Sequence, residues 1–201
     1  MRTVLLHSCC APCSAAILEA MEKEEIRPVV FFFNPNIAPR EEYEKRKAEL
    51  VRHCKALGIE FHEGEYDHEA WLKAVAGLEN EPERGKRCEV CFRLRLKAVA
   101  EKAKELGIDS FTTSLASSRW KSLPQVSAAG HEAETTVGVS FWDRNWRKGG
   151  LQDRRNALLK LYGFYNQTWC GCEFSKRDAD RAREEKQSAR PEEDARVKTH
   201  D

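Results

Sequence analysis

Seven of the eight cysteines in this chain fall into three short motifs. The motifs are C-C-x-x-C at residues 9–13, C-x-x-C at residues 88–91 and C-x-C at residues 170–172. Thiolates at such spacing bind metal ions or carry out redox chemistry, and seven thiols exceed the four that one tetrahedral zinc or one iron–sulfur cluster takes. The count therefore predicts two metal centres, or one centre beside a free thiol pair. The seven residues are Cys9, Cys10, Cys13, Cys88, Cys91, Cys170 and Cys172.

The first motif lies on a tight turn between a predicted strand and a predicted helix. A short apolar run predicts the strand over Thr3–Ser8, and a proline followed by small and apolar residues predicts the helix over Pro12–Glu24. Ligands bind at the edge of an open α/β sheet where the strands end, and the helix dipole there favours a thiolate over a thiol. The turn contains no glycine, which argues against a phosphate-binding loop. We therefore expect a metal or redox site at this turn.

The spacing of the thiols is compatible with three kinds of site. A zinc ion could join the C-x-x-C motif to one other pair, a C-x-x-C dithiol could cycle through a disulfide bond, or the thiols could hold an iron–sulfur cluster. The cluster is favoured because the thiols are expected at a ligand-binding edge and lack the compact spacing of a zinc ribbon. Neighbouring side chains diverge in extended backbone, so we expect Cys9 and Cys10 to be divided between two centres. Cys54 falls on the apolar stripe of a predicted helix and is expected to be a core thiol.

Strands and helices alternate over most of the chain. This pattern predicts a doubly wound, mostly parallel α/β sheet of the Rossmann-like kind, with a metal-binding edge. We expect residues 1–175 to form a single domain and the charged residues 176–201 to form a helical or disordered tail. The further predicted strands are Val29–Phe33, Ile59–His62, Ser110–Ser114 and Thr135–Val139, and the further helices are Pro39–Leu57, one after the N-cap Asp67, Phe92–Leu106, one within 117–129, and Gln152–Tyr162.

The composition indicates which partners and which cellular compartment to expect. The chain has 201 residues and a net charge of +1, which by itself indicates no nucleic-acid partner. No apolar run is long enough for a membrane span and the first residues lack a secretory pattern, so we expect no membrane partner and a cytoplasmic protein with reduced thiols. Locally, residues 84–97 contain six cations and one anion. Such a segment is either a phosphate-binding patch or a solvated helix face.

Several further motifs accompany the cysteines. They are Leu5-Leu6-His7-Ser8 before the first motif, Asn34-Pro35-Asn36-Ile37, Glu42-Tyr43 with Arg46, Arg87 before Cys88, Phe92 after Cys91, Arg95-Leu96, and Tyr165-x-Gln167-x-Trp169 before the last motif. In this order and spacing they resemble the cobalamin-independent epoxyqueuosine reductases of the QueH type, over nearly the whole chain to about Ser175. Some members have aspartate at the position of Cys13, so the resemblance implies a metal ligand there that can be either residue.

The resemblance implies a reaction, a fold and cofactors. The family reduces epoxyqueuosine, at the wobble position of certain tRNAs, to queuosine, the last step of queuosine biosynthesis. Its fold is similar to the adenine-nucleotide α-hydrolase (HUP-like) group, and it carries a 4Fe-4S cluster with a second mononuclear iron. The implied partners are a tRNA with epoxyqueuosine in its anticodon loop and an external electron donor. The chain has no G-x-G-x-x-G after its first strand, so no NAD or flavin is expected, and the family uses no cobalamin.

Candidates for proton transfer and substrate binding surround the thiols in the inferred fold. His7 or Asp67 could bring a proton to the departing oxygen, and a strand-end hydrogen bond and a helix N-cap are their respective alternatives. Asn34 and Asn36 leave the second strand at the same edge and either bind the modified base or shape the loop. The candidate substrate-binding residues are Asn34, Asn36, Tyr43, Arg46, Arg87, Arg95, Ser118, Lys121, Arg154 and Gln167.

Aromatic and basic residues are the candidates for contacts with RNA, because proteins recognise single-stranded loops by stacking and by arginine. Trp142 and Trp146 belong either to such a surface or to the core. A zinc-stabilised RNA-binding module without redox activity is the alternative function, and an ATP-using sulfur-transferase is disfavoured by the glycine-free turn. The RNA-contact candidates are Arg84, Lys86, Arg87, Arg93, Arg95, Arg119, Trp120, Lys121, Trp142, Trp146, Arg147 and Lys148.

Overall fold

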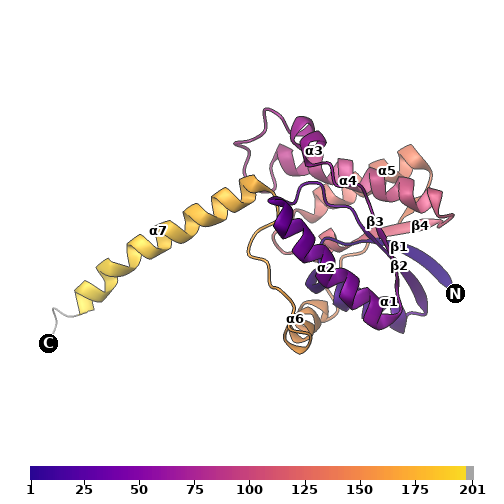
Figure 1. Ribbon diagram of the computed structural model, residues 1–201, viewed down its shortest axis with the longest axis horizontal. Helices are drawn as coiled ribbons and strands as arrows, with labels where there is room; N and C mark the ends of the chain where they lie inside the picture. The colour runs from indigo at the N-terminus through magenta and orange to yellow at the C-terminus, as the bar shows by residue number, and fades with distance from the viewer. Residues whose placement is uncertain (198–201) are drawn as a thin grey trace.

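The computed structural model describes the backbone of residues 1–197 and the side chains of residues 1–188. Its centre is a five-stranded parallel sheet with the order β3-β2-β1-β4-β5 (Figure 1). The strands are β1 (Arg2–His7), β2 (Ile26–Phe32), β3 (Glu60–Glu63), β4 (Ser110–Thr113) and β5 (Ser140–Phe141).

Helices cover both faces of the sheet, which confirms the predicted doubly wound α/β fold. The first helix packs against the second and the sixth, whereas the fourth packs against the third and the fifth on the other face (Figure 1). The helices are α1 (Ala11–Lys23), α2 (Arg40–Leu57), α3 (His68–Ala74), α4 (Lys86–Glu105), the 3₁₀ helix η1 (Ser114–Ser117), α5 (Leu123–Val137), α6 (Leu151–Leu161) and α7 (Glu173–Val197).

The two central strands are near-continuous apolar runs. Residues 4–6 of β1 and 29–32 of β2 are all buried. Strands of a parallel sheet consist largely of apolar residues because helices cover both faces of the sheet. These two strands form the rigid support from which the site residues emerge.

The direction in which the sheet grows reverses between β1 and β4. From β1 the chain builds outward through β2 to β3, and from β4 it builds outward to β5 on the other side. β1 and β4 lie side by side, with His7 paired to Thr113 at their carboxyl ends. Ligands bind in the crevice at such a switch point. Here the residues after β1 are the first cysteine motif, and those after β4 are η1.

The predicted strand over Thr135–Val139 is wrong. Residues 123–137 form α5, and the edge strand is the short β5 after Gly138. The hydroxyls of Thr135 and Thr136 donate to the carbonyls four residues earlier, at 2.9 and 2.7 Å. This local bonding lets β-branched residues remain inside a helix.

The predicted helix over Phe92–Leu106 begins six residues too late. In the structure α4 starts at Lys86 after the N-cap Gly85, so Cys88 and Cys91 both lie on the helix rather than before it. Residues three apart share a face of a helix. The helix therefore presents the two thiols together.

Helix α7 begins directly after Cys172 and extends away from the rest of the molecule (Figure 1). Some of its described side chains pair within the helix, as Lys176 does with Asp180 at 2.6 Å. The predicted tail over 176–201 is thus helical as far as Val197, and residues 198–201 lie outside the described residues. Within residues 1–197, no helix combines the length and apolar composition that a membrane crossing requires.

Candidate metal centre

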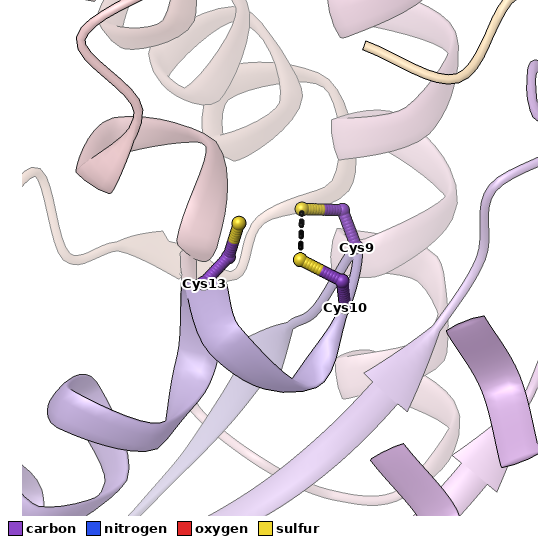
Figure 2. Close-up of side chains that lie close together, drawn as sticks. All are labelled: Cys9, Cys10 and Cys13. Atoms are coloured by element: carbon purple, nitrogen blue, oxygen red, sulfur yellow. Dashed lines mark hydrogen bonds between the residues drawn. The ribbon is translucent and has the colours of Figure 1, made fainter. Parts of the chain in front are cut away.

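The three thiols of the first motif converge. The sulfurs of Cys9 and Cys10 are 3.8 Å apart, and all three sulfurs lie within 4.8 Å of one another (Figure 2). The expectation that the first two side chains diverge is therefore wrong. The backbone bends at Cys9, which ends the strand alternation, and the first turn of α1 brings Cys13 back over the turn.

Serine side chains hold this turn in place. Ser114, the first residue after β4, accepts a hydrogen bond from the Cys9 amide at 3.2 Å, and its Oγ lies 3.5 Å from Cys9 Sγ. Ser14 donates to the Cys10 carbonyl at 3.0 Å and also bonds the Ser8 hydroxyl. Both strands at the switch point and the start of α1 are thereby tied together.

The environment of Cys9 lowers the pKa of its thiol, whereas that of Cys10 raises the pKa. Hydrogen bonds from Cys10 and Cys13 lower the pKa of the Cys9 thiol, and the charges of Arg95 and Lys121 lower it further. Burial raises the pKa of the Cys10 thiol. Metal ions bind the thiolate, so this group is prepared for a cation.

The other four motif cysteines form a second group. Cys91 and Cys172 share a small apolar cluster with Trp71. Burial raises the pKa of the Cys88 thiol to about 11 and that of the Cys172 thiol to about 12, and in both cases the charge of Cys170 adds to the rise. Within residues 1–188, only the first group has three sulfurs within 4.8 Å of one another, so the second group is more open.

Lys121 joins the two groups. Its Nζ donates to the Cys170 sulfur at 2.8 Å, and its charge also acts on Cys9. The seven thiols therefore occupy two neighbouring groups at one edge of the sheet, where the sequence predicted that they would converge. All eight cysteines, including the buried Cys54, are free.

Two cations beside the thiols have no carboxylate partner. Arg95 is 1% exposed and donates to Asn34 Oδ1, with Cys91 Sγ 3.9 Å from its other nitrogen. Among the side chains of residues 1–188, neither Arg95 nor Lys121 forms an ion pair with a carboxylate. A buried charge is costly unless it is compensated. Thiolates, and a metal centre that they ligate, supply the missing negative charge, so the donor set fits an iron–thiolate centre.

The C-x-C loop is held by one buried arginine. Arg46 pairs with Glu42 at 2.6 Å, and its two terminal nitrogens donate to the carbonyls of Cys170 and Trp169 at 3.1 and 3.4 Å. Gly171 lies so close to Ile37 that a Cβ there would be 2.9 Å from it, and its φ of 126° favours glycine. The loop therefore depends on α2 for its position.

A second buried arginine holds the segment before α4. Arg87 is 1% exposed, and its Nη1 donates to the carbonyls of Leu78, Glu79 and Glu81. Its guanidinium also lies 4.9 Å from the ring centre of Phe174, at the start of α7. Arg87 thus links the beginnings of α4 and α7, which carry the second group of thiols.

The predicted proton donors have other partners in this structure. His7 is fully buried, and burial, followed by the charge of Arg95, lowers its pKa to about 3. Both ring nitrogens have hydrogen-bond partners, since the Phe33 carbonyl lies 3.1 Å from Nε2 and Thr113 Oγ1 lies 2.8 Å from Nδ1. Asp67 is exposed and caps α3 by accepting from the Ala70 amide at 2.8 Å.

Asn34 and Asn36 are both 1% exposed, but they differ in their bonding. Asn34 donates to the Ser8 carbonyl at 2.9 Å and accepts from Arg95, so it joins β1, β2 and α4. The side-chain oxygen and nitrogen of Asn36 have no hydrogen-bond partner among the described residues. The next residues contact the C-x-C loop, since the Ala38 amide donates to the Gly171 carbonyl at 2.9 Å. Asn36 therefore lies between the two segments that carry thiols.

The remaining predicted substrate-binding residues are dispersed. Tyr43 is buried and donates to Glu63 at 3.0 Å, and Gln167 donates to the Tyr165 carbonyl at 3.1 Å. Ser118 lies on the loop after η1, next to the segment that carries Lys121. Arg154 pairs with Glu19 at 2.6 Å beside a cavity of about 300 Å³ whose lining includes none of the cysteines.

The two tryptophans after β5 pack inside the protein. Trp146 is fully buried and its indole donates to Thr112 at 3.2 Å, while Trp142 packs edge-on against it at 5.2 Å. The sequence left open whether this pair belongs to an RNA-contact surface or to the core, and Trp146 belongs to the core. The sequence analysis missed Ser8, Ser14 and Ser114, although the serines at the end of the predicted fourth strand were a signal for polar contacts at this edge.

Fold and site together define a doubly wound α/β protein with a thiol-rich centre at its switch point. A family model described as "Epoxyqueuosine reductase QueH" matches residues 4–178. The chain is 45% identical over 183 residues to a protein of that name from Haemophilus influenzae, covering 90% of this chain and 75% of the relative. It is 42% identical over 181 residues to the one from Acinetobacter baylyi, covering 90% and 83%. The chain therefore belongs to the epoxyqueuosine reductase QueH family.

Two solved structures share the fold at low sequence identity. A predicted tRNA methyltransferase subunit from Methanocaldococcus jannaschii has a TM-score of 0.56 and 14% identity, over 78% of this chain and 74% of that one. The U34-tRNA thiolase NcsA from Methanococcus maripaludis, solved with its [4Fe-4S] cluster, has a TM-score of 0.51 and 13% identity, over 89% of this chain and 63% of that one.

Proposed function

We propose that this chain is an epoxyqueuosine reductase, which reduces epoxyqueuosine to queuosine at the wobble position of tRNA. Membership of the family supports the reaction. The observation in the structure that carries the proposal is the pair of thiol groups at the switch point, accompanied by the cations Arg95 and Lys121 without carboxylate partners. Such a site suits a redox centre with net negative charge.

The reaction needs a source of electrons that no side chain provides. An epoxide, two electrons and two protons become an alkene and a water molecule, and an external donor supplies the electrons. A 4Fe-4S cluster would pass electrons one at a time and a second iron would act as a Lewis acid on the epoxide oxygen. The four thiols of the second group would hold the cluster, and the three thiols of the first group would hold the iron.

The protein's own residues position the substrate and the thiols. Asn36 contacts the modified base, and this base provides the hydrogen-bond partners that the buried side-chain amide of Asn36 otherwise lacks. Arg95 and Lys121 offset the negative charge of the centre, and the neutral His7 keeps the ends of β1 and β4 in register by its bond to Thr113. Arg46 and Arg87 hold the two segments that bring the second group of thiols to the site.

The test is an anaerobic assay with the full chain. The protein is purified without oxygen, its iron and sulfide are measured, and Mössbauer spectra are recorded. It is then incubated with epoxyqueuosine-tRNA and dithionite, and the nucleosides are identified by mass. We expect bound iron and sulfide and conversion to queuosine. A colourless protein that binds zinc and tRNA but forms no product would instead support a zinc-stabilised RNA-binding module. Cys54→Ala is the matched control, because this buried thiol belongs to neither group.

A further inference from the structure

Trp120 is the most exposed aromatic side chain among residues 1–188. It is 74% exposed, and the next, Tyr162 on the other side of the sheet, is 43% exposed. Burial of an aromatic ring gives a large hydrophobic gain, which an exposed indole does not obtain. An exposed tryptophan on a firmly held loop is therefore suited to stack against a ligand.

The loop that carries Trp120 is held from three directions. Arg84 donates to the carbonyls of Arg119 and Trp120 at 3.1 and 3.0 Å, and Arg147 donates to the carbonyl of Lys121 at 2.8 Å. Ser118 accepts from the Trp120 amide at 3.3 Å. These bonds fix the backbone on both sides of the indole and leave its ring free.

The backbone of Arg84 shows that this arrangement has a cost. Its φ is 70°, a left-handed conformation that side chains other than glycine seldom adopt. Gln125 of α5 stabilises it by donating to the Arg84 carbonyl at 2.7 Å. Strained backbone of this kind persists where the surrounding structure requires it and is concentrated at functional sites.

The surface around the indole is positively charged. The guanidinium groups of Arg84, Arg119 and Arg147 form no ion pair with a carboxylate among the described side chains of residues 1–188. Unpaired cations of this kind contact phosphates. Lys121, the next residue after Trp120, reaches the Cys170 sulfur, so the loop that carries the indole adjoins the thiol site.

We propose that Trp120 is a stacking platform for a base of the single-stranded RNA loop next to the modified nucleotide. The inference rests on the proposed function, in which that loop is the tRNA anticodon loop. The modified base must leave the stack of the RNA loop to reach the thiols, and the base next to it then loses a stacking partner. An aromatic ring beside arginines can replace that partner. Arg84, Arg119 and Arg147 then lie near the phosphates of the same loop.

The experiment measures RNA binding separately from turnover. The full chain, purified anaerobically with its metals, is titrated with an anticodon stem-loop RNA that carries 2-aminopurine beside the wobble position. The wild type should quench the probe. Trp120→Leu should weaken affinity between about 5-fold and 150-fold, and Trp120→Phe should restore most of it. The matched control is Tyr162→Leu, which removes a different exposed aromatic ring and should bind as the wild type does.

A salt series separates stacking from charge. Trp120→Leu should leave the slope of log affinity against log salt unchanged, whereas Arg119→Ala should reduce it. For turnover, Trp120→Leu should raise KM for the tRNA with kcat nearly unchanged.

The outcomes also separate the two proposals. If the wild type forms no queuosine but its RNA binding depends on Trp120, the proposed function fails and the inference stands. If the wild type forms queuosine and Trp120→Leu has wild-type affinity and KM, only the inference fails. Absence of RNA binding by the wild type, or an equal loss in Tyr162→Leu, would also overturn it.

Discussion

The two groups of thiols are built in different ways. Cys9, Cys10 and Cys13 come from one continuous turn, and their neighbours Ser8 and Ser14 help to hold them. The second group joins the start of α4 to a loop before α7, two segments that are far apart in the sequence.

Different interactions hold the two groups together. The first group needs a bend, a helix start and three serine hydroxyls, of which only that of Ser114 comes from a distant part of the sequence. The second needs two buried arginines: Arg46 bonds to the carbonyl of Cys170, 124 residues away in the sequence, and Arg87 bonds to carbonyls of the segment just before α4. The first group should therefore keep its geometry in variants whose substitutions, far from the thiols in sequence, displace the second group.

The largest effect is expected from loss of a thiol in the first group. Cys9→Ala removes the sulfur that lies 3.8 Å from Cys10 Sγ and 3.5 Å from Ser114 Oγ. We expect more than about 100-fold loss of turnover, since even partners of metal ligands contribute 10- to 100-fold. Iron content and queuosine formation measure it. Cys54→Ala should keep the iron content and the turnover of the wild type. An equal loss in that control would mean that the effect is not specific to the first group.

Arg46→Ala should disturb the second group and the stability together. The change leaves Glu42 buried without its partner, which costs roughly 3–5 kcal/mol, and it frees the C-x-C loop. Urea denaturation and iron analysis measure the two effects. Arg40→Ala removes an exposed pair on the same helix, with Glu44, and should cost less than about 1 kcal/mol. Similar losses in both variants would contradict the role of Arg46.

Arg95→Met should act on both groups through charge. This arginine lies beside Cys91 and its charge lowers the pKa of the Cys9 thiol. Its removal should reduce iron affinity about 10- to 100-fold and make the centre harder to reduce, as redox titration would show. Arg93→Met removes an exposed cation, paired with Glu132 on the same helix, and should change neither property.

The two asparagines after β2 offer a matched pair of variants. Asn34→Leu removes the hydrogen-bond partner of the Ser8 carbonyl and of Arg95 Nη2, so it should destabilise the fold by about 1–3 kcal/mol. Asn36→Leu breaks no protein hydrogen bond and should leave stability unchanged or higher while raising KM for the tRNA. Denaturation and kinetics on both variants test this, and a wild-type KM in Asn36→Leu would remove this residue from substrate binding.

The smallest effect is expected far from both groups. Arg154→Ala removes the partner that lowers the pKa of Glu19, in an exposed pair whose contribution to stability is small because solvent screens it. A lowered carboxyl pKa stabilises the fold above the unfolded value and stops doing so as the pH falls through the folded value. The stability difference between wild type and variant should therefore vanish in acid. A large loss of turnover would instead return Arg154 to the substrate site.

Much of this architecture could be read from local patterns. The apolar runs of β1 and β2, the N-cap Asp67 and the stop at Gly58 all depend on neighbours in the sequence. The strand over Thr135–Val139 failed because side chain to backbone bonds inside α5 override the β preference of threonine.

The sequence by itself determined the family, the order of the elements and the seven thiols. It could not decide how the thiols group, because that depends on a bend at Cys9 and on Arg46, which bonds to a segment far away in the chain. Nor could it separate Asn34 from Asn36, which have the same side chain in one loop. Only the tertiary structure supplies partners to the first and leaves the second unpaired. Burial and pairing depend on the whole fold, whereas spacing depends on the chain alone.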